Sequence, residues 1–122
     1  MKLRIRGNSV RLRLTQTEVK KLTEEGIVEE KTEFGNGQVL VYAVSTSNQI
    51  KSVTASFENN RLDILLPNEA AQNWAENEEV GISESLGSLQ ILVEKDFKCL
   101  TPRAGEEDSD TFPHPNEKLH NC

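Results

Sequence analysis

The residue types best suited to bind a metal ion lie near the C-terminal end of the chain. They are the two cysteines and the two histidines of the 122-residue sequence, Cys99, His114, His120 and Cys122. Two thiolates and two imidazoles could complete a tetrahedral zinc site. However, a single residue separates His120 from Cys122, which is not a common zinc-ligand spacing, and three prolines lie in the same segment. We therefore expect no metal and no cofactor, with these four residues as the candidate ligands if a metal does bind.

Other chemistry finds little support in the residue pattern. The acidic run at residues 106–110 could attract Ca²⁺ or Mg²⁺, but it has neither the central glycine nor the closing glutamate of an EF-hand. The sequence contains no glycine-rich phosphate loop and no serine-nucleophile elbow. Cys99 with His114 as its base is the one nucleophilic pair that the residue types allow. We predict that the protein is not an enzyme.

A cluster of cations near the start of the chain is the main candidate for binding an anionic partner. Basic residues alternate with Leu3, Ile5, Val10 and Leu12 on both sides of a Gly-Asn turn, which is typical of a β-hairpin with one apolar and one cationic face. Phosphates would give such a face affinity for nucleic acid. An acidic protein segment is the other partner that its charge allows. The cationic residues are Lys2, Arg4, Arg6, Arg11 and Arg13.

Two other interpretations of these cations stay open. Charged outward positions are what any half-buried strand shows, so the face could be solvated only. Alternatively, the acidic run at 106–110 could lie across it, in the same molecule or in a neighbour. The charges are unevenly distributed: residues 1–51 carry a net charge of +3, residues 52–99 carry −6 and residues 100–122 carry −3. The total net charge of −6 argues against general adhesion of the whole molecule to nucleic acid.

The elements that must position these residues occur twice. A shift of 52 residues places residues 2–41 on residues 54–93 without a gap, with eight identities in forty columns, among them Asn8 on Asn60, Leu14 on Leu66 and Val41 on Val93. The apolar positions also coincide, and like patterns bury like faces. In the first copy, Thr15 and Glu18 form a capping box before a helix that we expect to end near Gly26. Each copy therefore predicts the order ββαββ.

The predicted fold is mainly β, of the α+β class. We expect the repeats at 1–47 and 52–99 to form one pseudo-two-fold β-barrel with two short helices, because a unit of about 50 residues buries too little apolar surface to fold alone. Residues 1–99 then make a single domain. Residues 100–122 lack periodicity and form an irregular acidic tail, either disordered or docked through Leu100 and Phe112.

The segment from Gly7-Asn8-Ser9 to Leu14, followed by a capped helix and a hairpin, resembles the swapped-hairpin domain of AbrB and of MazE-type antitoxins. In that family two chains intertwine into one barrel that binds DNA, so the resemblance implies a single-chain version in which the two copies replace two subunits. The second copy keeps the family's proline in Leu65-Leu66-Pro67, and the first lacks it. At the positions of the five cations the second copy has Thr54, Ser56, Glu58, Asp63 and Leu65, so only half of a two-fold footprint is cationic.

The tail, from Cys99-Leu100-Thr101-Pro102-Arg103 to Phe112-Pro113-His114-Pro115, resembles the closing segment of a small bacterial family of uncharacterised proteins. No apolar run reaches the about 18 residues that would span a bilayer, and two cysteines do not make a disulfide framework. We expect a cytoplasmic binding module that holds nucleic acid or an acidic protein segment and does not act at a membrane. Its oligomeric state stays open, and a monomer fits because the duplication mimics a dimer. The alternative is a protein-interaction or metal-binding protein that acts through its tail.

Overall fold

The structure is a computed structural model that describes residues 1–96 and residue 112. Its elements follow the predicted order ββαββ twice. The first copy comprises β1 (Lys2–Arg6), β2 (Ser9–Leu14), α1 (Gln16–Glu25), β3 (Ile27–Glu33) and β4 (Val39–Ser47). The second comprises β5 (Thr54–Glu58), β6 (Arg61–Pro67), α2 (Asn68–Glu76), β7 (Gly81–Leu86) and β8 (Leu89–Lys95). The protein is therefore mainly β with two short helices, as the sequence predicts.

The hairpins of the two copies are interleaved in two four-stranded sheets. Sheet A has the order β1-β2-β8-β7 and sheet B the order β3-β4-β6-β5. Each sheet joins the first hairpin of one copy to the last hairpin of the other through a parallel pair, β2 with β8 and β4 with β6. Exchanging the copies converts one strand order into the other, so the topology has a pseudo-two-fold relation between the repeats.

The gapless alignment is correct for the first hairpins and helices and wrong for the second hairpins. Leu12 pairs with Val93 in sheet A, and its counterpart Ile64 pairs with Val44 in sheet B. Val93 is therefore equivalent to Val44, and the predicted match to Val41 is coincidental. The cause is hairpin length: β3 and β4 flank a turn at residues 34–38, whereas β7 and β8 are joined at residues 87–88, and a longer loop follows α2.

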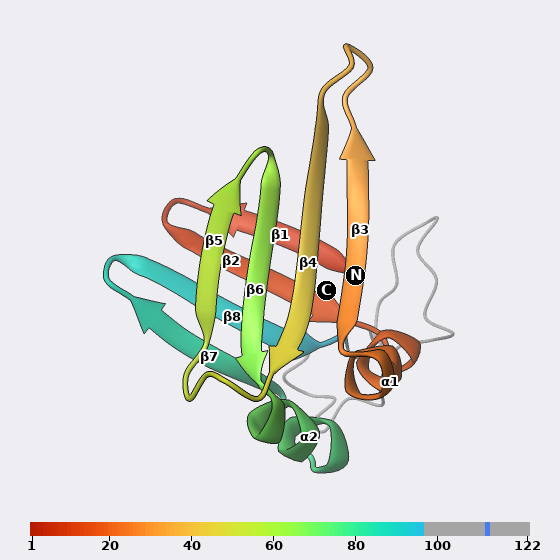
Figure 1. Ribbon diagram of the computed structural model, residues 1–122, viewed down its shortest axis with the longest axis vertical. Helices are drawn as coiled ribbons and strands as arrows, with labels where there is room; N and C mark the ends of the chain where they lie inside the picture. The colour runs from red at the N-terminus through yellow and green to blue at the C-terminus, as the bar shows by residue number, and fades with distance from the viewer. Residues whose placement is uncertain (97–111, 113–122) are drawn as a thin grey trace, which may run out of the picture.

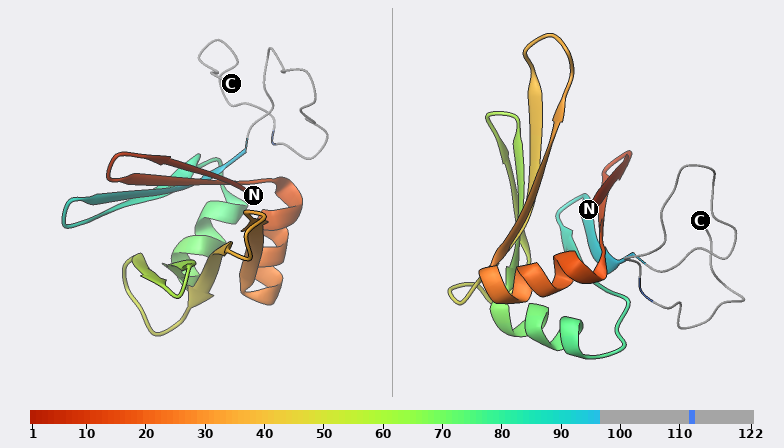
Figure 2. Two further views of the ribbon diagram at one scale, coloured as in Figure 1. Left: turned by 90° about the horizontal axis from the view of Figure 1, so that it is seen from above. Right: turned by 90° about the vertical axis from the view of Figure 1, so that its right-hand side faces the viewer.

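Both sheets and both helices share one core. In Figure 1, sheet B lies in front of sheet A with its strands running across those behind, and α1 and α2 lie together at one end. The buried cluster combines strand residues such as Leu12 and Ile64 with Leu22 of α1 and Trp74 of α2. Figure 2 shows the hairpin tips extending away from the helices. The expected barrel is not formed, since the strands belong to two separate sheets that do not close on each other.

Local sequence explains both ends of α1. Thr15 accepts a hydrogen bond from the Glu18 amide, and the Glu18 carboxylate accepts one from the Thr15 amide, so the predicted capping box is present. Gly26 ends the helix at a φ of 85°, a left-handed conformation in which glycine carries no steric penalty. In α2, Pro67 takes the place of Thr15 and provides no side-chain cap.

Candidate functional site: the basic face of sheet A

The five cations of the first hairpin share the outer surface of sheet A, which we call the basic face. The register of β1 and β2 pairs Lys2 with Arg13 and Arg4 with Arg11, and it leaves Arg6 opposite Ser9 at the tip. The alternating residues Val10, Leu12 and Leu14 are buried, so the intervening basic side chains point away from the core. The structure thus brings the predicted residues together on one surface.

Acidic residues at the end of β8 neutralise part of this face. Glu94 Oε1 accepts a hydrogen bond from Arg13 Nε at 2.6 Å and lies 3.5 Å from Arg11 Nε. Lys2 Nζ lies 3.3 Å from Asp96 Oδ2. The Glu94 and Asp96 side chains are only 11% and 7% exposed, so these pairs are screened less than ordinary surface pairs. Three of the five cations therefore have carboxylate partners within the molecule.

Arg4 and Arg6 are the part of the basic face that is available to a partner. Both are exposed on β1, which is an edge strand of sheet A. Within residues 1–96 and at residue 112 neither guanidinium has an ion-pair partner. Because successive outward residues on a strand are about 7 Å apart, the two charges can contact neighbouring anionic groups of an extended partner.

The matching surface on sheet B has a different character. Its register pairs Thr54 with Leu65 and Ser56 with Asp63, as expected for the counterparts of the basic residues. Its two cations are paired within the sheet: Arg61 is held by Asp63 at 2.9 Å and by Glu29 at 2.7 Å, and Lys31 lies 3.5 Å from Glu33. The cationic surface is therefore one-sided, in agreement with the charge difference between the copies.

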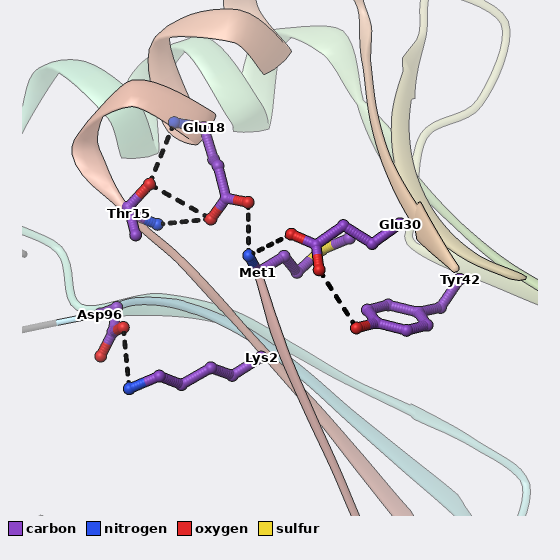
Figure 3. A network of polar contacts seen from close by, with 7 residues as sticks. All are labelled: Met1, Lys2, Thr15, Glu18, Glu30, Tyr42 and Asp96. Atoms are coloured by element: carbon purple, nitrogen blue, oxygen red, sulfur yellow. Dashed lines mark hydrogen bonds and ion pairs between the residues drawn. The ribbon is translucent and has the colours of Figure 1, made fainter. Parts of the chain in front are cut away.

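A polar network around the N-terminus could not be found by sequence reasoning (Figure 3). The α-amino group of Met1 contacts Glu18 and lies 2.6 Å from Glu30 Oε1, and the Tyr42 hydroxyl donates to Glu30 Oε2 at 3.2 Å. Burial alone would lower the pKa of the amino group, but its hydrogen bonds to Glu18 and Glu30 outweigh burial and raise that pKa. Burial alone would raise the pKa of Glu18. Its hydrogen bonds from the Met1 amino group and the Thr15 amide outweigh burial and lower that pKa. The network ties β1, α1 and β3 together.

Glu94 and Asp96 were also missed as partners of the basic face. They follow the apolar residues of β8 directly, and charged residues at the end of a buried strand are the one signal that the sequence offers. Nothing in the sequence shows that residues about 80 positions apart would meet in a parallel pair, because that pairing depends on the interleaving of the hairpins.

The tail candidates lie largely outside the described residues. Cys99, His114, His120 and Cys122, the acidic run at 106–110 and Leu100 all belong to segments that the structure does not describe. Phe112 is described, and it packs against the core, as one of the two predicted forms of the tail requires. Among residues 1–96 and residue 112, no group of three or more metal-binding side chains occurs. No helix in this part of the chain is long and apolar enough to cross a membrane.

The fold and the site define a duplicated α+β domain with a one-sided cationic sheet face. A family model matches residues 1–116, and the chain belongs to this family, which is described as a family of unknown function (DUF7009). The match covers both repeats and part of the tail. No curated protein and no solved structure matches the chain.

Proposed function

We propose that the protein is a small non-enzymatic binding module that holds an anionic partner on the basic face of sheet A. The observation that carries this proposal is the exposure of Arg4 and Arg6, which lack an ion-pair partner in the described part of the chain, beside a partly exposed Arg11. A face that is solvated only, without a partner, would be the simpler interpretation if its charges were balanced, as they are around Arg61 on sheet B. The imbalance favours a partner that supplies negative charge.

Nucleic acid is the partner class that this surface fits best. The interleaved hairpins and the pseudo-two-fold topology support a relation to the swapped-hairpin domains of AbrB and MazE-type antitoxins, with the two copies in place of two subunits. The outward residues of β1 and β2 are arginine, lysine and serine, which contact phosphates rather than stack on bases. We therefore expect salt-dependent binding with little sequence preference, by a monomer in the cytoplasm of a bacterium.

Fluorescence anisotropy with a labelled DNA duplex at low salt tests the proposal. The double variant Arg4→Gln/Arg6→Gln should bind more weakly, and its plot of log K against log salt should be shallower by about 1.8, since each lost phosphate contact removes about 0.9. Lys20→Gln/Lys21→Gln on α1 is the matched control, because it removes two exposed positive charges at a distance from the face. Equal binding by the two double variants would refute the role of the basic face.

A second candidate function is an interaction protein that is masked by its own tail. One contact favours it: the Phe112 amide donates to the Asp96 carbonyl at 2.8 Å, and the side chain of the same Asp96 binds Lys2 of the basic face. Phe112 is thus attached where the basic face ends, and the acidic run at 106–110 ends two residues before it in the sequence. Neutralising the run with Glu106→Gln/Glu107→Gln/Asp108→Asn/Asp110→Asn should strengthen duplex binding if the tail masks the face. Unchanged binding would remove this candidate.

A further inference from the structure

The outer surface of sheet A continues beyond the basic face onto the last hairpin of the second copy. Side chains on the same side of paired strands form rows that cross the sheet in the order β1-β2-β8-β7 (Figure 1). The row nearest the hairpin turns contains Arg6, Ser9, Gln90 and Ser85. The next row contains Arg4, Arg11, Leu92 and Ser83. These two rows, which we call the tip half of sheet A, carry three arginines and no carboxylate.

The carboxylates of sheet A lie outside its tip half. Glu94 is near the end of β8 that lies toward the helices, and there it binds cations, as does Asp96 directly after the strand. Glu84 belongs to β7, but it pairs with the buried Ile91 and therefore lies on the core side of the sheet. Because β1 is an edge strand, the acid-free surface beside its exposed arginines extends across the tip half toward β7.

Hydrogen bonds at the turns join the two hairpins of the tip half. The Asn8 side chain donates to Ser88 Oγ at 2.8 Å, and the Gln90 backbone amide donates to the Asn8 carbonyl at 2.9 Å. Next to them, the Ser85 hydroxyl donates to Gln90 Oε1 at 2.7 Å. Because this bond engages the oxygen of the exposed Gln90 side chain, its NH₂ group is directed to donate to a partner. The surface thus has a fixed shape and adds a neutral donor to the arginines.

We propose that the partner of the basic face is a phosphodiester backbone that crosses the tip half of sheet A from β1 to β7, where Gln90 and Ser83 of the second copy bind it. This inference rests on the proposed function, and it adds the path of the partner and two further contact residues. Arginine, glutamine and serine side chains all commonly contact phosphates. Adjacent strands are about 4.8 Å apart, so the path is about 14 Å long and spans several successive phosphates of one strand.

The chemistry of the two rows favours this path over the alternatives. A backbone that followed β1 toward the helices would bring its phosphates to Glu94 and Asp96, whose charges repel them. The tip half contains no aromatic side chain on which a base could stack, so its contacts are to the backbone. The second copy therefore takes part through its last hairpin, although its first hairpin lacks the cations.

A lysine introduced at the far end of the path tests its direction. Ser83→Lys adds a cation on β7, so in duplex anisotropy the plot of log K against log salt should become steeper by about 0.9, the value of one added phosphate contact. Ser56→Lys is the matched control, because Ser56 is also an exposed outward serine on an edge strand, but of sheet B. Its slope should stay close to that of the wild type. If Ser83→Lys does not fold, Ser85→Lys at the next outward position of β7 gives the same test.

Gln90→Ala tests the neutral contact. It should lower the affinity about two- to tenfold, as expected for the loss of one hydrogen bond, and leave the salt slope unchanged, because no charge is lost. Gln38→Ala is the control: the exposed Gln38 precedes β4 in sheet B, and its Oε1 likewise accepts a side-chain hydrogen bond, from Asn60 at 3.2 Å. This variant should bind like the wild type. Circular dichroism and thermal denaturation of each variant check that the fold is kept.

The results separate failure of the path from failure of the proposed function. If the wild-type chain does not bind the duplex, the proposed function fails and this inference fails with it. If the wild type binds and Arg4→Gln/Arg6→Gln weakens binding, the basic face is supported independently of the path. The path is then overturned if Ser83→Lys gives the same slope as Ser56→Lys, or if Gln90→Ala binds as tightly as Gln38→Ala.

Discussion

Glu94 should stabilise the fold and, at the same time, weaken the affinity of the basic face for anions. Its carboxylate binds Arg13 at 2.6 Å and lies 3.5 Å from Arg11, with 11% of the side chain exposed. Glu94→Gln keeps the shape and a neutral acceptor but removes the charge. A hydrogen bond to a charged group contributes about 1.5–3 kcal/mol to stability. Because the glutamine oxygen still accepts a hydrogen bond, we expect the free energy of unfolding to fall by about 1.5 kcal/mol and Tm to fall by about 5 °C.

The same substitution should strengthen binding to a DNA duplex. Two guanidinium groups are released to contact phosphates, which should steepen the plot of log K against log salt by up to about 1.8. The gain should be clearest in the lowest-salt measurements and disappear as salt screens the face. A variant that is less stable yet binds more tightly distinguishes this mechanism from general damage to the fold.

The assay combines thermal denaturation with duplex anisotropy on the same preparations. Glu29→Gln is the matched control, because it removes one carboxylate partner of Arg61 on the outer surface of sheet B. Glu29 is 48% exposed and Arg61 keeps Asp63, so this change should cost little stability and leave binding unaltered. If Glu94→Gln lowers Tm but binds no more tightly than Glu29→Gln, Arg11 and Arg13 serve the fold alone and the proposed role of this part of the face is refuted.

Three further predictions concern the scaffold. With a free α-amino group, Tm should be highest between about pH 4.5 and pH 8. The Met1 amine, whose pKa is raised by folding, loses its contribution to stability as pH rises through that pKa. Glu18, whose pKa is lowered by folding, loses its contribution as pH falls through that pKa. The Tm difference between wild type and Glu18→Gln, followed by circular dichroism, should therefore shrink as pH falls below about 4.5, and a constant difference would contradict this linkage. Thr15→Ala removes the capping hydroxyl and should cost about 1 kcal/mol in urea denaturation. Thr23→Ala on the same helix, which removes only an exposed hydrogen bond to the Lys20 carbonyl, should cost much less. Gly81→Ala would place a methyl group 2.7 Å from the Val93 carbonyl oxygen, so the free energy of unfolding should fall by about 1–3 kcal/mol. Ser83→Ala on the same strand is the control. If Gly81→Ala loses no more stability than this control, the strands can separate freely at Gly81.

Local signals in the sequence explain what could be predicted. Thr15 with Glu18 and then Gly26 delimit α1, and alternation of apolar residues around Gly7-Asn8 defines the first hairpin. These patterns involve neighbours within a few residues, so physical rules about caps and pleats apply directly. The outward position of the five cations follows from the same alternation.

The errors and omissions arise where distant segments meet. The gapless repeat fails in the second hairpins because turn length can change while the equivalent inward-facing pairs, Val28 with Val44 and Ile82 with Val93, are kept. Closure into a barrel depends on how sheet edges meet, which alternation does not determine. The carboxylates of β8 reach the basic face only because the last hairpin of the second copy joins the first hairpin of the first copy.

This interleaving has a consequence for how a nucleic acid could be bound. The buried surfaces of the two sheets face one another, so their outer surfaces point to different sides of the molecule (Figure 2). A pair of identical subunits would present two equivalent basic faces, and symmetric dimers bind symmetric half-sites. Here the counterpart face carries Asp63 and Glu58, and its Arg61 is already bound to two carboxylates. A duplex could therefore be held from one side only, so the proposed function predicts that binding affinity is the same for palindromic and non-palindromic duplexes of equal length.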